Sequence, residues 1–483
     1  MTNETFSDRL KLAMQAKQFK QVDLIRAAQR RGVKLGKSHV SQYVSGKTVP
    51  RSDILHFLAD VLQVDPDWLL AKDSTVNYTA DTVSDPAESF SDPSAASLSQ
   101  TKTGGSPMRE FKKSSKLDNV LYDVRGPVVE EANRMEACGT QVLKLNIGNP
   151  APFGFRTPDE VIYDMSHQLT DCEGYSPSQG LFSARKAIMQ YAQLKKLPNV
   201  SIDDIYTGNG VSELINLCMS ALLDDGDEIL IPSPDYPLWT ACATLAGGKA
   251  VHYICDEQSE WYPDIDDMRK KITDRTKAIV IINPNNPTGT YVPIGELEAF
   301  ADTIPEDVLL VMDEAYMEFA TEPDCCSMVD YMKAHPEKPI LVLRTFSKYY
   351  AMAGLRVGYA LGSEEMIGIM RKCSASWNLN VCAQKAAVAG LADQEYYQEQ
   401  KAKIVEGREY LEKEMAALGC RVYPSQSNFI YFDTGKDPAW IQEQLMEKGI
   451  RIGAFEMSRV SVGTMEECKL YIKALKEILE AAE

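Results

Sequence analysis

Short apolar runs alternate with helix-like stretches over most of the chain beyond residue 200, and this alternation constrains the fold more than any other feature. Each run is four or five residues long, which is the length of a strand buried inside a sheet. Stretches with helical periodicity, such as residues 212–223 and 294–302, separate the runs. This order predicts an α/β fold with a mostly parallel central sheet. The predicted strands are residues 228–231, 250–254, 278–282, 308–312, 340–343 and 357–361.

A smaller α+β unit is predicted after this alternation ends. It covers residues 420–482, and its closing helix spans residues 464–479. Before the first strands, the amphipathic run 128–135 predicts a helix that leads into the strand-like residues 142–147. The globular body therefore begins near Lys113.

The first 70 residues are predicted to form a separate, all-helical domain. Leu10 and Met14 fit one face of a first helix, and Val22 and Ile25 begin a second. A third helix is predicted over residues 38–45, and it ends at a glycine. A fourth is predicted from an apolar stripe made by Ile54, Leu55, Leu58, Ala59 and Leu62.

Residues 72–105 are rich in Ser, Thr, Asp and Ala, which predicts a flexible linker. We therefore expect a helical domain over residues 1–72, a linker over 73–112 and the globular body over 113–483. Up to Lys72 there are 12 Lys and Arg against 7 Asp and Glu, whereas the whole chain has a net charge of −18. A basic head on an acidic body indicates that only the head meets nucleic acid.

Composition also limits the cellular location and the kinds of site that the chain can have. The apolar runs are far too short to cross a bilayer and the start MTNETFSDRL has no signal-peptide core, so we expect a cytoplasmic protein without membrane contact. Eleven cysteines without paired zinc-type spacing indicate reduced thiols. Five histidines lie far apart, so no metal site is predicted.

Polar side chains follow three of the predicted strands, where a parallel sheet binds its ligands. The turn Asn-Pro-Asn-Asn-Pro-Thr-Gly follows residues 278–282, Asp313 follows the next strand, and Thr345 and Lys348 follow residues 340–343. Upstream, the stretch Gly-Asn-Gly-Val-Ser opens a helix with free backbone N–H groups that favour a phosphate. Taken singly, each of these features also has a plain structural explanation as a turn, a helix cap or a glycine-rich helix start.

Taken alone, the stretch around Lys348 supports two interpretations about equally well. It follows a buried strand and stands among Phe346, Tyr349, Tyr350 and Met352, where desolvation would favour a neutral, nucleophilic amine. It could equally be a surface lysine at the end of a strand. The ordered combination with the other motifs favours the first reading, because together they supply what a phosphorylated pyridine aldehyde needs.

With these motifs, residues 113–483 resemble the fold-type-I (class I/II) aminotransferases, which use pyridoxal 5′-phosphate (PLP). The resemblance implies a large domain over about residues 150–370, with a mostly parallel seven-stranded sheet. It also implies a smaller α+β domain from about residues 113–149 and 371–483. The activity implied is transfer of an amino group between an L-amino acid and a 2-oxo acid.

The resemblance also implies a role for individual residues. Lys348 would form the Schiff base, Asp313 would pair with the pyridine nitrogen, and Tyr316 would bond the ring 3-oxygen together with Asn286. Tyr236 would stack on the ring, and Tyr175 would reach the phosphate of the other subunit, which implies a homodimer. The phosphate would be held by Gly210, Val211, Ser212, Thr345 and Arg356.

Substrate recognition is assigned in the same way. Arg459 occupies the family position for the α-carboxylate, which a planar guanidinium binds with two hydrogen bonds; its plain alternative is a surface arginine on an edge strand. Gly148, Asn149 and Asn286 match positions that line the substrate. The stretch 206–288 looks most like bacterial alanine (glutamate–pyruvate) aminotransferases, whereas residues 344–362 look more like histidinol-phosphate aminotransferases. Gly453 replaces an arginine of that second group, so a phosphorylated substrate loses support.

The stretch SHVSQYVSGKTVPRSDILHFLADVLQVDPDWLL resembles the Xre/Cro-like helix-turn-helix family. In that family the third helix enters the major groove of DNA. Ser38, His39 and Gln42 would then contact bases, and Gln21, Lys37 and Lys47 would contact phosphates. The connection over residues 29–36 is longer than usual, which leaves single base contacts open. A helical module that no longer binds DNA is the alternative.

Two functions from different classes remain open at this point. In the first, the chain is a dimeric aminotransferase with a DNA-binding head. In the second, it is a transcription regulator whose aminotransferase-like body only senses PLP or an amino acid. Turnover separates them, because a sensor binds its ligand and stops.

Overall fold

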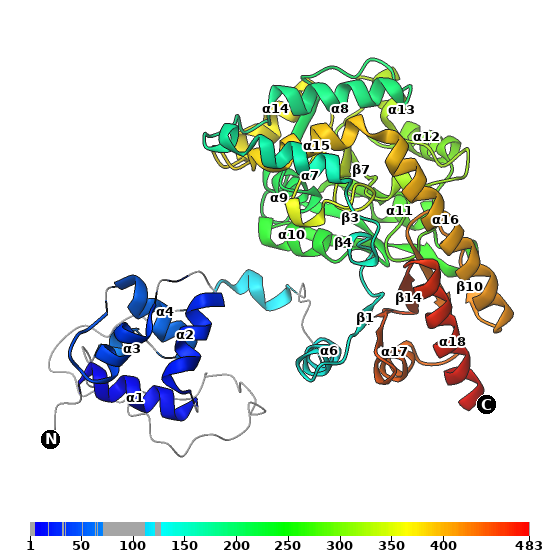
Figure 1. The fold of residues 1–483 in the computed structure, drawn as a ribbon. Helices are drawn as coiled ribbons and strands as arrows, with labels where there is room; N and C mark the ends of the chain where they lie inside the picture. Colours follow the sequence, from blue (N-terminus) through cyan, green and yellow to red (C-terminus); the bar gives the residue numbers. More distant parts are fainter. Residues whose placement is uncertain are drawn as a thin grey trace, which may run out of the picture. The chain divides into compact units, whose positions relative to one another are not determined.

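The computed structural model describes residues 5–17, 19–30, 33, 35–50, 52–62, 64, 66–70, 112–120 and 127–482. The chain divides into two compact units, Met1–Arg109 and Glu110–Glu483, which are described separately (Figure 1). Almost all of the predicted linker lies outside the described residues. The predicted domain boundaries at residues 72 and 113 therefore stay predictions.

Five helices make up the described part of the first unit. Thr5 begins α1 with a capping box, in which its hydroxyl accepts from the Asp8 amide and the Asp8 carboxylate accepts from the Thr5 amide. Leu10, Leu24 and Val40 are fully buried and pack α1, α2 and α3 on one core. The helices are α1 (Phe6–Ala16), α2 (Gln21–Arg30), α3 (Lys37–Val44), α4 (Ser52–Leu62) and the short α5 (Pro66–Leu69).

A mixed eight-stranded sheet forms the centre of the second unit, and its inner pairs β8–β7, β7–β6, β6–β3 and β3–β4 are parallel. The prediction of seven strands was wrong by one, because the chain turns back after β4 and adds the two-residue β5 antiparallel to it. In spatial order the strands are β2 (Ile205–Gly208), β9 (Gly358–Leu361), β8 (Ile340–Thr345), β7 (Leu309–Asp313), β6 (Thr276–Ile282), β3 (Glu228–Ser233), β4 (Lys249–Asp256) and β5 (Tyr262–Pro263).

Helices cover both faces of this sheet, which is why its strands are apolar without alternation (Figure 1). Successive residues of β7 face opposite sides: Leu310 and Met312 pack into one core, and Leu309 and Val311 into the other. One side carries α9 (Val211–Leu222), α10 (Leu238–Ala246) and α14 (Glu364–Cys373). The other carries α7 (Asp159–His167), α8 (Phe182–Leu194), α12 (Ile294–Thr303), α13 (Val329–Ala334), α15 (Val381–Ala392) and part of α16 (Gln394–Ala417). The short α11 (Ile265–Lys271) lies beside β4.

A second, four-stranded antiparallel sheet has the order β10–β11–β14–β13. The predicted strand over residues 142–147 is only the two-residue β1, which pairs in parallel with β12 from near the end of the chain. Thr464 caps the last helix through Glu467, close to where that helix was predicted to begin. The elements are α6 (Pro127–Ala137), β1 (Leu143–Lys144), β10 (Arg421–Val422), β11 (Phe429–Asp433), α17 (Pro438–Glu447), β12 (Ile450–Arg451), β13 (Gly453–Ala454), β14 (Ser458–Ser461) and α18 (Met465–Ala481).

Short 3₁₀ helices complete the second unit: η1 (Ser115–Asn119), η2 (Ala151–Phe153), η3 (Leu169–Cys172), η4 (Glu257–Ser259), η5 (Met317–Phe319) and η6 (Ala353–Leu355). Within the described parts of the chain, every helix is too short or too polar to cross a membrane. The cytoplasmic location stays a prediction.

Candidate active site

Asp313 is the last residue of β7, and its carboxylate is buried with the side chain 3% exposed. Its position after Met312 turns it toward the sheet face that carries α10, where the Trp239 indole N–H donates to it over 3.1 Å. The amide of Ala315 donates to its other oxygen over 3.2 Å. Burial raises the pKa of Asp313 to about 6, and these two hydrogen bonds limit the rise. This carboxylate is therefore held ready to meet a cationic partner.

Lys348 lies in the turn that follows β8, the strand next to β7. Its side chain is half-buried, and the Nζ atom is 5.7 Å from the centre of the Tyr316 ring. Tyr316, which is buried, packs edge-on against Phe429 of the smaller sheet at 5.0 Å between ring centres. The lysine, the phenol and Asp313 thus all follow or end two neighbouring parallel strands, β7 and β8, at their carboxyl ends.

A cradle for an anion forms where β2 passes into α9. Gly210 begins the helix with φ +80° and ψ 169°, a conformation that is open almost only to glycine. A Cβ atom on Gly210 would come within 2.6 Å of Nη2 of Arg356, and one on Gly358 within 3.1 Å of the Val211 nitrogen. Gly358 pairs with Thr345 across β8 and β9. The helix start with Val211 and Ser212, the arginine and the threonine are therefore brought together, which suits a phosphate group.

Arg356 itself adopts a left-handed backbone conformation with φ +58°. Its guanidinium donates to the carbonyl of Asn209 over 3.2 Å and to that of Ala353 over 3.0 Å. These two carbonyls fix the cation above the glycine turn while leaving other N–H groups for a ligand.

Arg459 lies on β14, the strand between β11 and β13, and only 8% of it is exposed. Its guanidinium lies between the rings of Phe429 and Phe455, each 4.9 Å away. One terminal nitrogen donates to the side-chain oxygen of Asn286, and the other donates to the carbonyl of Asn146 over 2.8 Å. Burial lowers the pKa of this arginine. The alternative of a surface arginine on an edge strand is excluded.

Several buried polar atoms around this arginine have no partner within the described residues: Nε of Arg459, the side-chain oxygens of Asn146 and Asn149, and both polar atoms of the Asn428 amide. Asn428 also abuts Gly148, where a Cβ atom would come within 2.9 Å of its oxygen. Buried polar groups are normally paired, so this set fits a site that a polar ligand completes. Together with the cradle and Asp313, the donors match a phosphorylated pyridine and a carboxylate.

Tyr236 and Tyr175 are the two remaining predicted residues of the cofactor site. Tyr236, half-buried, precedes α10, and its carbonyl accepts from the Trp239 amide over 3.0 Å, which places it one turn from the partner of Asp313. Tyr175 is 83% exposed and stacks on Trp377. Trp239 and Asn428 escaped prediction, because their roles arise from contacts between distant elements.

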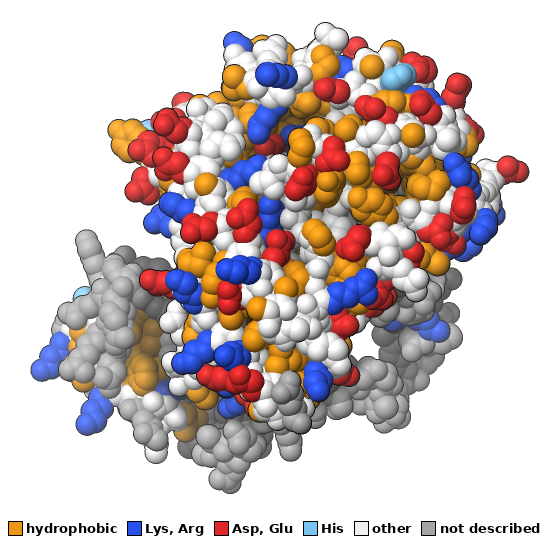
Figure 2. Space-filling model, turned by 90° about the vertical axis from the view of Figure 1, so that its right-hand side faces the viewer, with side chains coloured by type: hydrophobic (Ala, Val, Ile, Leu, Met, Phe, Trp, Pro, Cys, Tyr) orange, Lys and Arg blue, Asp and Glu red, His pale blue; other side chains and the backbone are white. Residues whose placement is uncertain are grey.

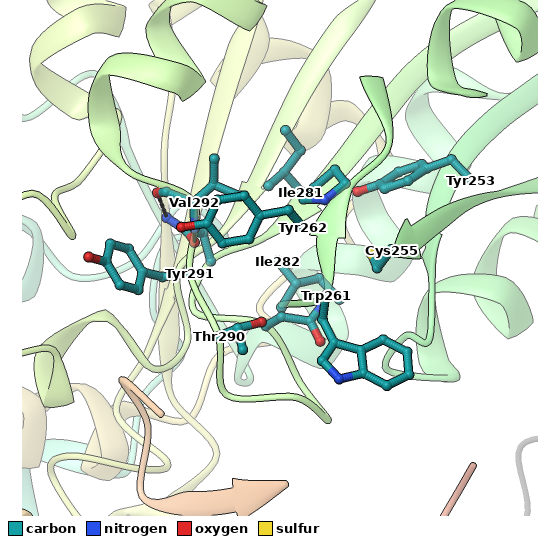
Figure 3. A pocket seen from close by; sticks show the side chains of 12 residues that line it. Tyr253, Cys255, Trp261, Tyr262, Ile281, Ile282, Thr290, Tyr291 and Val292 are labelled. Atoms are coloured by element: carbon teal, nitrogen blue, oxygen red, sulfur yellow. Dashed lines mark hydrogen bonds between the residues drawn. The ribbon is translucent and has the colours of Figure 1, made fainter. Parts of the chain in front are cut away.

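A separate small cavity lies between β4, β5, β6 and the turn after β6, and Figure 3 shows the aromatic side chains Tyr253, Trp261, Tyr262 and Tyr291 around it. Its volume of about 10 Å³ is room for a single water. Lys348 and Asp313 do not line the cavity, so it is a packing feature of the loop that carries Asn286.

Residues 140–475 match the family model described as aminotransferase class I and II. The chain belongs to this family. It is therefore a transaminase that depends on PLP.

Named relatives and solved structures agree with this membership. The glutamate-pyruvate aminotransferase AlaA of Escherichia coli K12 is 47% identical over 300 residues, which are 59% of this chain and 72% of that protein. The histidinol-phosphate aminotransferase 2 of Carboxydothermus hydrogenoformans is 35% identical, over 75% of this chain and 98% of its own. The alanine aminotransferase of Pyrococcus furiosus superposes with a TM-score of 0.70 at 30% identity and covers 77% of this chain and 100% of its own.

Proposed function

We propose that this transaminase moves the amino group between L-alanine or L-glutamate and a 2-oxo acid. The observation that carries the proposal is Arg459, a buried guanidinium close to two aromatic rings and hydrogen-bonded to Asn286, whose Nε has no hydrogen-bond partner among the described residues. It suits the α-carboxylate of an amino acid. The named alanine and glutamate–pyruvate aminotransferases among the relatives support the choice of donor.

In this proposal the predicted residues hold PLP as the family resemblance implies. Gly210, Val211 and Ser212 at the start of α9 bind its phosphate together with Thr345 and Arg356. Asp313 pairs with the pyridine nitrogen, Tyr236 stacks on the ring, and Asn286 and Tyr316 bond its 3-oxygen. When bound, PLP supplies a ring that accepts electrons and so stabilises negative charge at the substrate Cα.

The chain's own side chains then bind, orient and transfer a proton. Arg459 fixes the substrate carboxylate, and Gly148 and Asn149 line the space beside it. Lys348 Nζ, held near the Tyr316 ring, would act as the general base that takes the proton from the substrate Cα and as the general acid that delivers it to the C4′ carbon of the cofactor. Burial raises the pKa of Asp313 and so disfavours its charged form. A protonated ring nitrogen beside it would stabilise the carboxylate, and the carboxylate would in turn keep the ring nitrogen protonated.

A panel of amino donors tests the substrate proposal. Full-length protein loaded with PLP is offered L-alanine, L-glutamate, L-aspartate, an aromatic amino acid and histidinol phosphate, and the cofactor absorbance and the released 2-oxo acid are followed. Alanine and glutamate should react fastest, and Lys348→Ala should remove turnover with all five. Fastest turnover of histidinol phosphate would overturn the donor assignment, and binding of donors without product would favour the sensor alternative.

We further propose a homodimer in which Tyr175 reaches the phosphate of the partner. The exposure of Tyr175 supports this proposal. Its side chain is 83% exposed and stacks on Trp377, so its hydroxyl is accessible to a second subunit. Sedimentation of the purified chain tests the oligomeric state. A monomer that keeps full activity would refute the shared site.

The first unit is proposed to bind DNA. On α3, Lys37, His39 and Gln42 are exposed whereas Val40 is buried, so the helix presents a polar face suited to a groove. Gln21 and Lys47 are exposed as well and would contact phosphates, and the side chain of Ser38 lies outside the described residues. Figure 2 shows acidic and basic side chains interspersed over the face that it draws. The sequence up to Lys72, by contrast, has more Lys and Arg than Asp and Glu.

A further inference from the structure

Two large aromatic side chains lie stacked and exposed on the surface of the second unit. The rings of Tyr175 and Trp377 are 5.1 Å apart and within 21° of parallel. Tyr175 is 83% exposed and Trp377 is 60% exposed. An aromatic pair that stays in contact with water adds little to the stability of the isolated subunit. Its exposure therefore indicates that the pair contacts another molecule.

The backbone holds Trp377 in an unfavourable conformation. Its φ is +56°, a value that bulky residues rarely adopt. Its amide donates to the hydroxyl of Ser178 over 3.3 Å, and that hydroxyl donates to the carbonyl of Ala375 over 3.4 Å. Ser176 also donates to the carbonyl of Leu379 over 3.4 Å. The turn around Trp377 is thus joined to the loop that carries Tyr175.

The same turn is joined on its other side to the glycine turn of the anion cradle. The side-chain amide of Asn378 donates to Glu213 of α9 over 2.8 Å, and its carbonyl accepts from the side chain of Asn209 over 3.0 Å. Glu213 in turn accepts from the Asn209 amide over 2.6 Å. Asn209 stands between Gly208 and Gly210. A continuous set of contacts therefore leads from the chain's own phosphate cradle, through Asn378 and Trp377, to Tyr175.

We propose that Trp377 is a positioning residue for the active site of the partner subunit. By stacking on Tyr175, it holds this tyrosine in the orientation that delivers its hydroxyl to the partner's phosphate. The inference rests on the proposed function, because it needs the homodimer and the shared site. It adds that Trp377 acts in trans, on the site that its own subunit does not contain.

Mixed dimers of the full chain separate action in trans from action in cis. One subunit always carries Lys348→Ala, so that only the other subunit can form the covalent PLP link and give its absorbance band. Three dimers are compared: wild type with Lys348→Ala as reference; wild type with the double variant Lys348→Ala, Trp377→Ala; and Trp377→Ala with Lys348→Ala. The measurement is the rate at which PLP leaves the linked site after dilution.

Only the second dimer places the missing indole opposite the site that is read. There PLP should leave about tenfold faster or more, because a hydrogen bond to a charged phosphate contributes about 1.5–3 kcal/mol. In the third dimer the rate should stay within about twofold of the reference. Faster release in the third dimer alone, or equal rates in all three, would overturn the proposal.

Two further variants test whether faster PLP release could result from misfolding of the Trp377→Ala subunit. Trp377→Phe keeps an aromatic face and should restore most of the reference rate in the second dimer. Tyr175→Phe in the subunit that carries Lys348→Ala should match the loss caused by Trp377→Ala, and combining both should add little. A reference dimer without the absorbance band would overturn the proposed function and this inference together. A reference dimer that has the band, with additive losses in the combination, would overturn the inference alone.

Discussion

Asp313 should make the stability of the cofactor-free chain depend on pH. Its pKa rises from 3.8 in the unfolded chain to about 6 in the folded one, mainly through burial. A raised pKa stabilises the fold while the group is protonated, so this contribution is complete below about pH 4 and lost as the pH approaches 6. Replacing Asp313 by Asn should thus stabilise the cofactor-free chain, relative to wild type, by up to about 3 kcal/mol more at pH 7 than at pH 4. Urea unfolding across this range measures it, and a difference that is constant with pH would contradict it.

Arg459 should control the apparent affinity for amino acids but not for simple amines. Arg459→Ala removes the charged contacts assigned to the α-carboxylate, so KM for alanine and glutamate should rise on the order of a hundredfold, the equivalent of about 3 kcal/mol. Reactivity toward an amine without a carboxylate should change little. Steady-state kinetics with both kinds of donor give the comparison, and equal losses for the two would assign Arg459 a structural role.

The sequence patterns predicted the candidate site residues that directly follow a strand. They missed residues whose contacts depend on which face of the sheet their side chains lie on. Asp313, Thr345 and Lys348 could be found because parallel strands end at a common edge. Trp239 donates to Asp313 from 74 residues away, and no local periodicity encodes such a contact. Arg344 stood inside the predicted motif without a role. It points to the opposite face from Leu343 and meets carboxylates there.

At the scale of elements, a buried ion network joins the ends of β7 and β8. Arg344 donates to Glu314 over 2.8 and 3.0 Å and to Glu318 over 2.9 Å, and Lys195, the residue after α8, pairs with Glu318 over 3.0 Å. Arg344→Met leaves the buried carboxylate of Glu314 without its cation and removes one of the two cations beside Glu318, so it should destabilise the second unit by about 3–5 kcal/mol. Adding Glu314→Gln and Glu318→Gln should recover most of the loss. Thermal unfolding of both variants tests the network, and a loss below about 1 kcal/mol for the single variant would refute it.

Gly210 at the start of α9 and Gly354 in η6 form a matched pair of glycines for a test of PLP binding. Gly210→Ala should weaken PLP binding about tenfold or more, because φ +80° costs any other residue about 1–3 kcal/mol and a Cβ would displace Arg356. Gly354, in the nearby η6, has open space around its Cα, so Gly354→Ala is the control and should leave binding unchanged. Equilibrium titration with PLP measures both. Equal affinities for the two variants would remove the cradle from the phosphate site.

For the whole molecule, a two-fold dimer would present two basic heads, and a symmetric pair of heads should prefer an inverted-repeat DNA site. Full-length protein should bind an inverted repeat more tightly than a single half-site, with affinity that falls steeply as salt rises. Lys47→Ala should weaken binding to all sequences, and Gln42→Ala should reduce the preference for the best one. Lys270→Ala removes the same charge from an exposed position in the second unit and serves as control. Titrations against a selected DNA library at two salt concentrations decide the matter, and no binding at either would leave the head as a protein-interaction module.

The contact between Arg459 and the carbonyl of Asn146 joins residues 313 positions apart in the sequence. At the usual rate of synthesis, the ribosome needs roughly 15–60 seconds to add that much chain after Asn146. The first unit contains its own core within residues 6–69, so it can fold on the nascent chain long before Arg459 has been synthesised. If the head binds DNA, it can therefore search for its site during translation, at a time when the attached enzyme is still incapable of catalysis.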